Sequence, residues 1–372
     1  MTLTALIHGS GYAGQGHAQA LRDAGVKVVG MVSRTPEVVA QVAAKMGIPY
    51  AGTDWPQALA DLQPDVVAIG TPGGAHFEPI MAALAQGCHV YCDKPLAATA
   101  VHAKTLYQKS AAAGVKTAYA ASYRYMPHVL HAKELVASGT IGEPLEVECI
   151  SHFNLNPLIP FGWSHRLDQG GGRLNNNFTH KLSIVEHVLG GQITQASGTT
   201  RSDMGQAPIV PGIHHFRERH HFAPASADDP TLQWAESDAE WSYTVLAKIK
   251  TNQAGQPVSA LFRHMALQPR FQPDYIAFYG SEAAIYIEGH YGQGPLYIHP
   301  RRGQWQKRDL PGHIAAAQPD IADDTQRNWT ILAQEFVADI RGEGSSGYQT
   351  FKDGWIYQEV VEAVRQGNRW LI

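Results

Sequence analysis

The chain has 372 residues, a length that predicts two domains or three, and its 44% hydrophobic content is enough to build real cores. Its formal net charge of -4 gives no basic excess, which argues against a nucleic-acid partner. No apolar run approaches the roughly 18 residues of a membrane span, so we expect no membrane partner either.

Cysteine usage and the N-terminal stretch both bear on the compartment. Cys88, Cys92 and Cys149 are too few for a disulfide framework, and they indicate a reducing compartment. Cys88 and Cys92 stand four residues apart across a predicted strand, where we expect core thiols rather than metal ligands. The first residues lack a basic n-region and break into glycines before a useful apolar run develops. We therefore expect a mature, cytoplasmic protein.

From residue 3 to about 120, short β-rich runs alternate with amphipathic stretches, the pattern of parallel βαβ units. The continuous apolar run 66–69 is typical of a strand covered on both faces. We predict strands at 3–8, 26–32, 65–70, 89–92 and 116–120, and helices at 36–46, 55–62, 75–86 and 100–113. The fold class is α/β, with a Rossmann-type doubly wound parallel sheet over residues 1–122.

The pattern of apolar and polar residues changes after residue 123. We predict helices at 127–138, 327–341 and 353–366, and longer alternating strands at 145–153, 241–250, 258–263, 275–279 and 284–288. These elements predict an α+β domain over residues 123–372, with a large, mostly antiparallel sheet, for substrate binding and oligomerisation. The interval 205–238 is rich in Pro, His and Asp, and we expect a long loop excursion there.

A glycine-rich turn follows the first predicted strand and opens a helix. The stretch GSGYAG at residues 9–14 fits G-x-G-x-x-G in the context of a dinucleotide fingerprint. The glycines permit a tight turn and close approach of a pyrophosphate, which the helix amino end holds. A plain glycine turn is the structural alternative. The predicted cofactor contacts here are Gly9, Gly11, Tyr12, Ala13 and Gly14.

The end of the second strand carries Ser33 and Arg34. A carboxylate at this place would bind the ribose hydroxyls and repel a 2'-phosphate, whereas an arginine beside a small hydroxyl residue accommodates that phosphate. The pair therefore favours NADP as the cofactor over NAD. A solvated loop arginine is the alternative.

Two later strands end in residues that should line the same crevice, because ligands bind outside the carboxyl ends of an open parallel sheet. Thr71 and Pro72 end one strand, and Asp93, Lys94 and Pro95 end the next. We expect both ends to lie close to the nicotinamide ring.

These motifs together resemble the Gfo/Idh/MocA family of oxidoreductases, whose hallmark is an acid-Lys-Pro motif after the fifth strand. The resemblance rests on GSGYAG, on Thr71-Pro72 followed by His76, on GCHVYCDKPLA, and on the stretches YRYMP at 123–127 and GGGRLNNNFTH at 170–180. It covers most of residues 1–190. It implies cofactor contacts from Thr71, Pro72, His76, Asp93 and Lys94.

In this family the lysine of the motif lies beside the substrate hydroxyl that is oxidised, which carries over to Lys94. An ammonium near an oxidised nicotinamide in a partly desolvated cleft should have its pKa lowered from about 10.4. Such a lysine exchanges a proton with an alcohol that becomes a carbonyl. A plain loop charge is the alternative.

His180 falls where the family places a histidine that acts as acid or base, and histidine suits that work. This chain departs from the family at Asn176 and Ser183, where aspartates are usual, and at Phe178, where a glycine is usual. Asn176 and His180 stand one helical turn apart, so both can face the cleft. A packed helix histidine is the alternative role for His180.

The resemblance further implies substrate contacts from Tyr123, Arg124, His152, Trp163 and Arg166, beside Asn176 and His180. Aromatic and donor-rich linings suit polyhydroxylated rings, and two arginines could hold a carboxylate. The paired histidines at 214–215 and 220–221 match no zinc pattern, so we expect no metal.

The leading hypothesis is an NAD(P)-dependent oxidoreductase that moves a hydride between nicotinamide C4 and a secondary alcohol or ketone of a sugar-like, polyol or cyclic diol substrate. Two alternatives follow from the resemblance. One is an enzyme that retains its cofactor and cleaves a glycosidic bond through transient oxidation, and the other is a non-catalytic, dinucleotide-sensing regulator. The resemblance also implies a homodimer or homotetramer.

Overall fold

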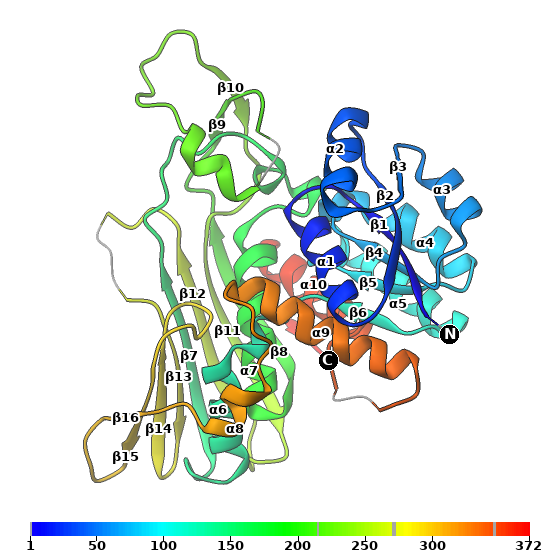
Figure 1. The fold of residues 1–372 in the computed structure, drawn as a ribbon. Coiled ribbons are helices and arrows are strands. Elements are labelled where there is room, and N and C mark those ends of the chain that lie inside the picture. The colour runs from blue at the N-terminus through cyan, green and yellow to red at the C-terminus, as the bar shows by residue number, and fades with distance from the viewer. Residues whose placement is uncertain (1, 214–215, 270–272, 345–346) are drawn as a thin grey trace.

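A parallel sheet forms the first layer of the computed structural model, which describes residues 2–213, 216–269, 273–344 and 347–372 (Figure 1). Within those residues the strands follow the order β3-β2-β1-β4-β5-β6, which confirms the Rossmann prediction. The strands are β1 (Thr4–His8), β2 (Lys27–Val32), β3 (Tyr50–Gly52), β4 (Val66–Ile69), β5 (His89–Cys92) and β6 (Thr117–Tyr119). All four residues of β4 are buried, as its apolar run predicts.

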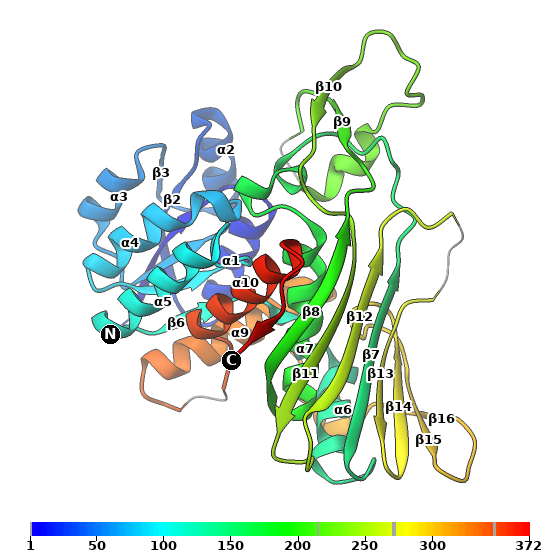
Figure 2. The ribbon, with the colours of Figure 1, turned by 180° about the vertical axis from the view of Figure 1, so that it is seen from behind.

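Helices connect these strands and cover the sheet (Figures 1 and 2). They are α1 (Tyr12–Asp23), α2 (Pro36–Met46), α3 (Trp55–Leu62), α4 (Phe77–Ala85) and α5 (Ala100–Ala113). Side chains fix two of the starts, since Asp54 accepts a hydrogen bond from the backbone N–H of Gln57 and Thr99 accepts one from His102. Helix α4 begins later than predicted because Gly73–Ala75 form a separate 3₁₀ turn, η1.

A second, larger sheet runs through the middle of the chain in the order β16-β15-β14-β13-β7-β12-β11-β8-β17. Every neighbouring pair is antiparallel except β7 with β12, which confirms the mostly antiparallel prediction. The strands are β7 (Pro144–His152), β8 (Gly191–Arg201), β11 (Ser242–Thr251), β12 (Val258–Met265), β13 (Tyr275–Gly280), β14 (Ala283–Glu288), β15 (Leu296–Pro300), β16 (Gln306–Arg308) and β17 (Trp370–Leu371).

The described helices of this second layer lie on one face of the large sheet, as the two opposite views show (Figures 1 and 2). They are α6 (Pro127–Ala137), α7 (Thr179–Leu189) and α8 (Gly312–Ala317). Nearly all of α7 is buried, because it packs between the sheet and the first domain. None of the helices in the described ranges is long and apolar enough to cross a membrane.

The interval expected to be a loop excursion has secondary structure of its own. Strand β9 (Gln206–Ile209) pairs antiparallel with β10 (Gln233–Glu236), and this ribbon projects beyond the end of the large sheet (Figure 1). Between the two strands lies a 3₁₀ helix, η6 (Phe216–Phe222). His214 and His215 lie outside the described residues.

Two C-terminal helices return to the first domain. Helix α9 (Asp324–Ile340) packs on α1, and α10 (Phe351–Arg365) packs on α5. The α1–α9 contact is close at Gly16, where an added Cβ atom would lie 2.1 Å from the ring of Trp329. The C-terminal segment thus completes the helical cover of the Rossmann sheet, while the division of the chain at residue 122 stays a prediction.

Gly16→Ala tests this contact. The indole of Trp329 is buried against neighbouring rings and cannot move aside cheaply, so we expect the free energy of unfolding to fall by about 1–3 kcal/mol. Urea unfolding measures the change. Gly312→Ala is the matched control, because a Cβ at Gly312 meets nothing within 4 Å. Equal stability of the two variants would show that the α1–α9 packing is looser than described.

Candidate active site

The glycine-rich turn between β1 and α1 has the shape that a pyrophosphate needs. Gly9 has φ +117°, and a Cβ on Gly14 would lie 1.9 Å from the carbonyl oxygen of Gly9. Gly11 is the N-cap of α1, and a Cβ there would meet no atom within 4 Å. The first backbone N–H groups of α1 therefore face open space with the positive end of the helix dipole behind them. These residues fit a bound dinucleotide.

Ser33 and Arg34 follow β2, at the edge of the turn. The backbone N–H of Ser33 donates to the carbonyl of Gly52 at 3.1 Å, which fixes the start of the loop. Arg34 is exposed, and within the described part of the chain no ion pair involves it. Its guanidinium is therefore free to meet a ligand at this end of the crevice.

His76 stabilises the crevice through the contacts of its two ring nitrogens. Its Nε2 donates to the carbonyl of Thr71 at 2.7 Å, and its Nδ1 lies 3.4 Å from Sγ of Cys92. Burial lowers the pKa of His76, so the ring is neutral. Its side chain has no exposed surface in this structure, and its contact with a cofactor stays a prediction. Thr71 and Pro72, which are partly exposed, line the crevice above it.

Lys94 stands at the carboxyl end of β5, after Asp93. Its Nζ donates to Oδ1 of Asn176 at 2.8 Å and lies 5.8 Å from the ring centre of Trp163. Burial lowers the pKa of Lys94, Asp93 works against that shift, and Arg173 adds to it. Burial also raises the pKa of Asp93. The peptide bond between Lys94 and Pro95, which the sequence leaves open, is cis.

Asn176 belongs to a π-helical turn, η5 (Leu174–Phe178), that runs directly into α7. Such turns are frequent at functional sites because they re-aim side chains within a helix. The side-chain amide of Asn176 donates to the carbonyl of Gly172 at 2.7 Å, which leaves Oδ1 turned to Lys94. Lys94 and Asn176, which come from different domains, are therefore in direct contact.

His180 lies edge-on to two tyrosines, with ring centres 4.7 Å from Tyr123 and 5.2 Å from Tyr291. Burial, and to a smaller extent Lys94, lowers the pKa of His180 well below its usual value. Its Nδ1 is buried without a hydrogen-bond partner. Ser183 does not orient it, because the Ser183 hydroxyl donates to Oε1 of Gln349 at 2.7 Å. His180 is thus a neutral imidazole beside Lys94.

Three predicted substrate residues lie elsewhere. Arg124 donates from Nε to Nδ1 of His187 at 3.0 Å, two helical turns along α7 from His180. Arg166 is half exposed and pairs with Asp168. The side chain of His152 points to the same face of β7 as that of Glu148, and both line a hollow on the open face of the large sheet. The structure thus gives each of these three residues a local partner or lining, and their contact with a substrate stays a prediction.

Other residues reach the site without having been predicted. Tyr291 stacks on Tyr123 at 4.1 Å between ring centres, and its hydroxyl donates to the carbonyl of Asn176 at 3.1 Å. Arg173 is the N-cap of the π-helical turn, within the stretch GGGRLNNNFTH on which the resemblance rests, and that stretch could have revealed it. Tyr291 has no comparable signal, because it comes from a distant loop after β14.

Arg217 links the excursion to the dinucleotide crevice. Its guanidinium lies 4.4 Å from the ring centre of Tyr12, and its Nη1 pairs with Asp323 at 2.7 Å. Its Nη2 donates to Oγ1 of Thr325 at 3.0 Å. Helix η6 is therefore held against the glycine-rich turn, across the amino end of α9.

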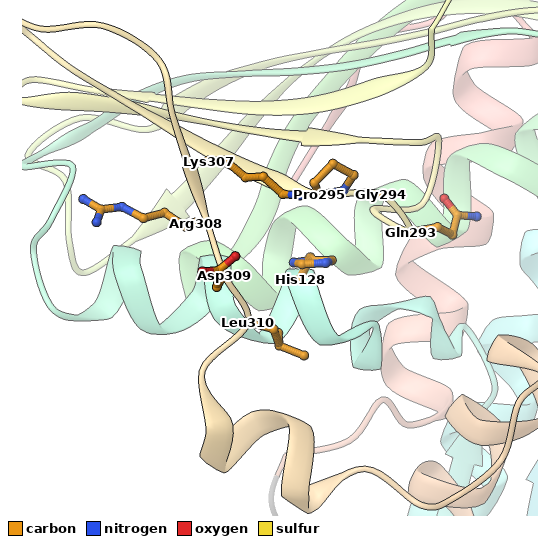
Figure 3. A pocket seen from close by; sticks show the side chains of 8 residues that line it. All are labelled: His128, Gln293, Gly294, Pro295, Lys307, Arg308, Asp309 and Leu310. Carbon is orange, nitrogen blue, oxygen red and sulfur yellow. The ribbon is translucent and has the colours of Figure 1, made fainter.

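Two hollows of the described surface lie away from these residues. One, of about 360 Å³, lies between the start of α6 and the segment after β16, and none of its lining residues belongs to the predicted site (Figure 3). Its lining residues are His128, Gln293, Gly294, Pro295, Lys307, Arg308, Asp309 and Leu310. The other, of about 550 Å³, lies on the open face of the sheet and includes His152.

No metal cluster accompanies the site: within the described ranges, no three His, Cys, Asp or Glu side chains gather closely enough to hold an ion. Cys88 and Cys92 are free and buried, in agreement with their prediction as core thiols, and Cys149 is free and buried as well.

Comparison with known proteins identifies the family. Residues 3–121 match the model of the "Oxidoreductase family, NAD-binding Rossmann fold", and residues 129–256 match the "GFO/IDH/MocA C-terminal domain". The two matches together cover about two thirds of the chain. The chain belongs to the Gfo/Idh/MocA family. Its first domain is therefore an NAD-binding Rossmann domain, as its glycine-rich turn predicts.

Curated relatives of this family member include a levoglucosan dehydrogenase of Pseudarthrobacter phenanthrenivorans, 30% identical over 158 residues, and a 4-carboxy-2-hydroxymuconate-6-semialdehyde dehydrogenase of a Sphingobium species, 32% identical over 212 residues. The matches span 42% and 56% of this chain, and 40% and 63% of the respective relatives. A solved levoglucosan dehydrogenase in complex with NADH and L-sorbose is 19% identical with a TM-score of 0.81, over 100% of this chain and 99% of that one. At that identity it shows a shared fold.

Asn176→Asp tests the electrostatics of Lys94. We expect the pKa of Lys94 to lie below its usual value of about 10.4 and to rise by about one unit or more when a carboxylate replaces the amide, because an opposite charge favours the ammonium. NMR titration of ¹³C-methylated lysines, assigned with Lys94→Arg, measures the shift. The exposed Asn252→Asp should leave the resonance unmoved. An unchanged pKa in Asn176→Asp would contradict the 2.8 Å contact.

Proposed function

We propose that this protein is an NAD(P)-dependent dehydrogenase or reductase that acts on a secondary alcohol or ketone of a sugar-like, polyol or cyclic diol substrate. The observation that carries the proposal is the position of Lys94, partly buried at the carboxyl end of β5 and hydrogen-bonded across the crevice to Asn176. A lysine with a lowered pKa at that point is suited to general acid–base work on the reacting hydroxyl.

The nicotinamide of the bound dinucleotide supplies the hydride chemistry. In the oxidation direction, neutral Lys94 accepts the proton of the substrate hydroxyl while the carbon loses its hydride. In the reduction direction, the Lys94 ammonium returns that proton to the forming alkoxide. Because oxidation needs the neutral amine, its rate rises with pH through the pKa of Lys94, and burial moves that rise below the pH expected for a solvated lysine.

His180 supports this chemistry as a neutral ring. Its pKa lies well below the usual value, so it does not titrate in the neutral range. Its position edge-on to the stacked rings of Tyr123 and Tyr291 suits it to orient a substrate hydroxyl by a hydrogen bond. We assign proton transfer to Lys94 and positioning to His180.

The names of the relatives support a hydroxyl-bearing substrate. They include levoglucosan, glucoside and inositol dehydrogenases and an anhydrofructose reductase. One relative is named for a carboxylated semialdehyde. The chain spans about half the length of the curated relatives it matches, so the substrate is proposed at the level of a class.

Lys94→Ala tests the catalytic assignment. We expect hydride transfer to fall roughly 10²- to 10⁴-fold, while binding of the dinucleotide stays nearly unchanged, because Lys94 acts on the substrate. The measurement is the absorbance of the reduced cofactor across sugars, inositols, sugar acids and cyclic diols, with calorimetry for cofactor binding.

Lys109→Ala, on the exposed side of α5, is the matched control. An unchanged rate in Lys94→Ala would refute the assignment. Products released without net reduction of the cofactor would favour the glycoside-cleaving alternative. Cofactor binding with no turnover of any substrate would favour a regulator.

We further propose NADP as the preferred cofactor. Arg34, next to Ser33, is exposed, and no acid among the described residues pairs with it. NADP should raise the melting temperature more than NAD at equal concentration, since a tighter ligand stabilises the folded state more. Arg34→Asp should reverse the order by repelling the 2'-phosphate. Greater stabilisation of the unaltered protein by NAD would overturn this preference.

We also propose that the protein is cytoplasmic and forms a homodimer or homotetramer. Three free, buried thiols support a reducing compartment. The face of the large sheet that the described helices leave uncovered supports self-association (Figure 2).

A further inference from the structure

Arg173 is a cation without an acidic partner at the candidate site. Its guanidinium lies against two aromatic rings, 5.0 Å from the centre of Trp241 and 5.5 Å from that of Phe153. Its Nε is buried and makes no hydrogen bond. Among the described residues, no carboxylate forms a salt bridge with it. The aromatic faces hold the guanidinium in place and leave its donors without an anion.

The nearest candidate acid is already engaged. The carboxylate of Glu240 accepts hydrogen bonds from Nε and Nη2 of Arg365 at 2.9 Å and 3.0 Å, and from the backbone N–H of Leu174 at 2.8 Å. Those contacts satisfy the carboxylate from the side of α10. Glu240 therefore fixes the backbone that carries Arg173 and acts on its guanidinium only at longer range, through its charge, without a salt bridge.

Arg173 is linked to the candidate site through a chain of rings. Phe153, against which its guanidinium lies, is 4.8 Å from His290 between ring centres. His290 in turn lies 4.1 Å from Tyr291, which packs edge-on against His180. The charge of Arg173 reaches Lys94 and the buried His165 and His264, whose pKa values it lowers. The guanidinium and the Lys94 ammonium thus belong to one electrostatic site.

A second buried arginine adds to the positive charge. Arg219, from η6, donates from Nη1 to Oγ of Ser164 at 2.8 Å. Burial and the nearby Arg173 lower the pKa of Arg219 to about 10. The charge of Arg219 therefore adds to that of Arg173 in the same buried region.

We propose that the substrate carries a carboxylate, which the guanidinium of Arg173 binds while the reacting hydroxyl meets Lys94. The proposal rests on the proposed function and narrows its substrate class to polyhydroxy acids, such as sugar acids. A planar guanidinium matches a planar carboxylate through two parallel hydrogen bonds. The Arg219 guanidinium is committed in part to Ser164, so the site offers one open fork, which fits a monoanionic carboxylate better than a phosphate dianion.

Substrate preference of the full-length protein tests this proposal. The probes are D-gluconate, D-glucuronate and D-galacturonate as acids, D-glucose, D-galactose and myo-inositol as neutral counterparts, and D-glucose 6-phosphate as the phosphate. Each is assayed with NADP and NAD through the absorbance of the reduced cofactor. We expect kcat/KM for at least one acid to exceed that of its neutral counterpart by about 100-fold, the cost of leaving a charge partner unpaired.

Variants at Arg173 separate charge recognition from catalysis. Arg173→Gln should lower kcat/KM for the acid about 100-fold more than kcat/KM for neutral sugars, mainly through KM, because any change in the pKa of Lys94 affects both classes of substrate alike. Arg173→Lys should recover part of the loss, because it keeps the charge and loses the fork. Arg201→Gln, exposed at the end of β8, is the matched control and should behave like the unaltered protein.

The outcomes distinguish this proposal from the one on which it rests. Turnover of neutral sugars with no preference for acids, or equal effects of Arg173→Gln on acids and neutral sugars, would overturn the carboxylate site and leave the dehydrogenase intact. Preference for D-glucose 6-phosphate would overturn the choice of carboxylate. No turnover of any probe, with no rise in the melting temperature of the NADPH-bound protein on adding D-gluconate, would overturn both proposals. An Arg173→Gln variant that fails to fold leaves Arg173→Lys and the probe panel to decide.

Discussion

The hydrogen bond from Nζ of Lys94 to Oδ1 of Asn176 joins two segments that are 82 residues apart. One partner ends a strand of the Rossmann sheet, and the other belongs to a π-helical turn beside the large sheet. The site exists only where these two layers meet, so every element that positions them affects the chemistry. A shift of either layer would separate the lysine from its partner and change its pKa.

Two glycines allow the Rossmann domain and the loop before η5 to come this close to each other. A Cβ on Gly74 would lie 2.2 Å from the carbonyl oxygen of Asp168, and one on Gly170 would lie 2.8 Å from Cγ of Pro95. The loop before η5 therefore rests directly on the ends of β4 and β5. Below them, buried His76 ties the Thr71 carbonyl to the β5 end. Backbone contact and a neutral histidine thus hold the crevice at the distance that the Lys94 contact needs.

Sequence patterns located the first domain well because its strands are continuous apolar runs and its motifs follow them directly. Strand β8 was missed because its residues are mostly small and polar, and only its pairing with β11 and β17 makes it a strand. The same limit applied to side chains. Arg166 pairs with Asp168, two residues away, and Arg124 donates a hydrogen bond to His187, whereas Arg173 forms no salt bridge with a described acid. A motif gives the position of an arginine in the chain, while the identity of its partner depends on packing across both layers.

The amide of Asn176, at a position where the family resemblance leads us to expect an aspartate, changes the charge of the site as well as its hydrogen bonds. A carboxylate beside Lys94 would have offset the charges of Lys94 and Arg173, whereas with the amide only the charges of Asp93 and Glu240 act against them. Such a site is costly in the free protein and becomes favourable when an anion enters it. Nδ1 of His180 and Nε of Arg173 also favour binding of a ligand, because both atoms are buried without a hydrogen bond that a ligand could supply. The protein therefore gives up some stability at the residues through which it would gain affinity for an anionic substrate.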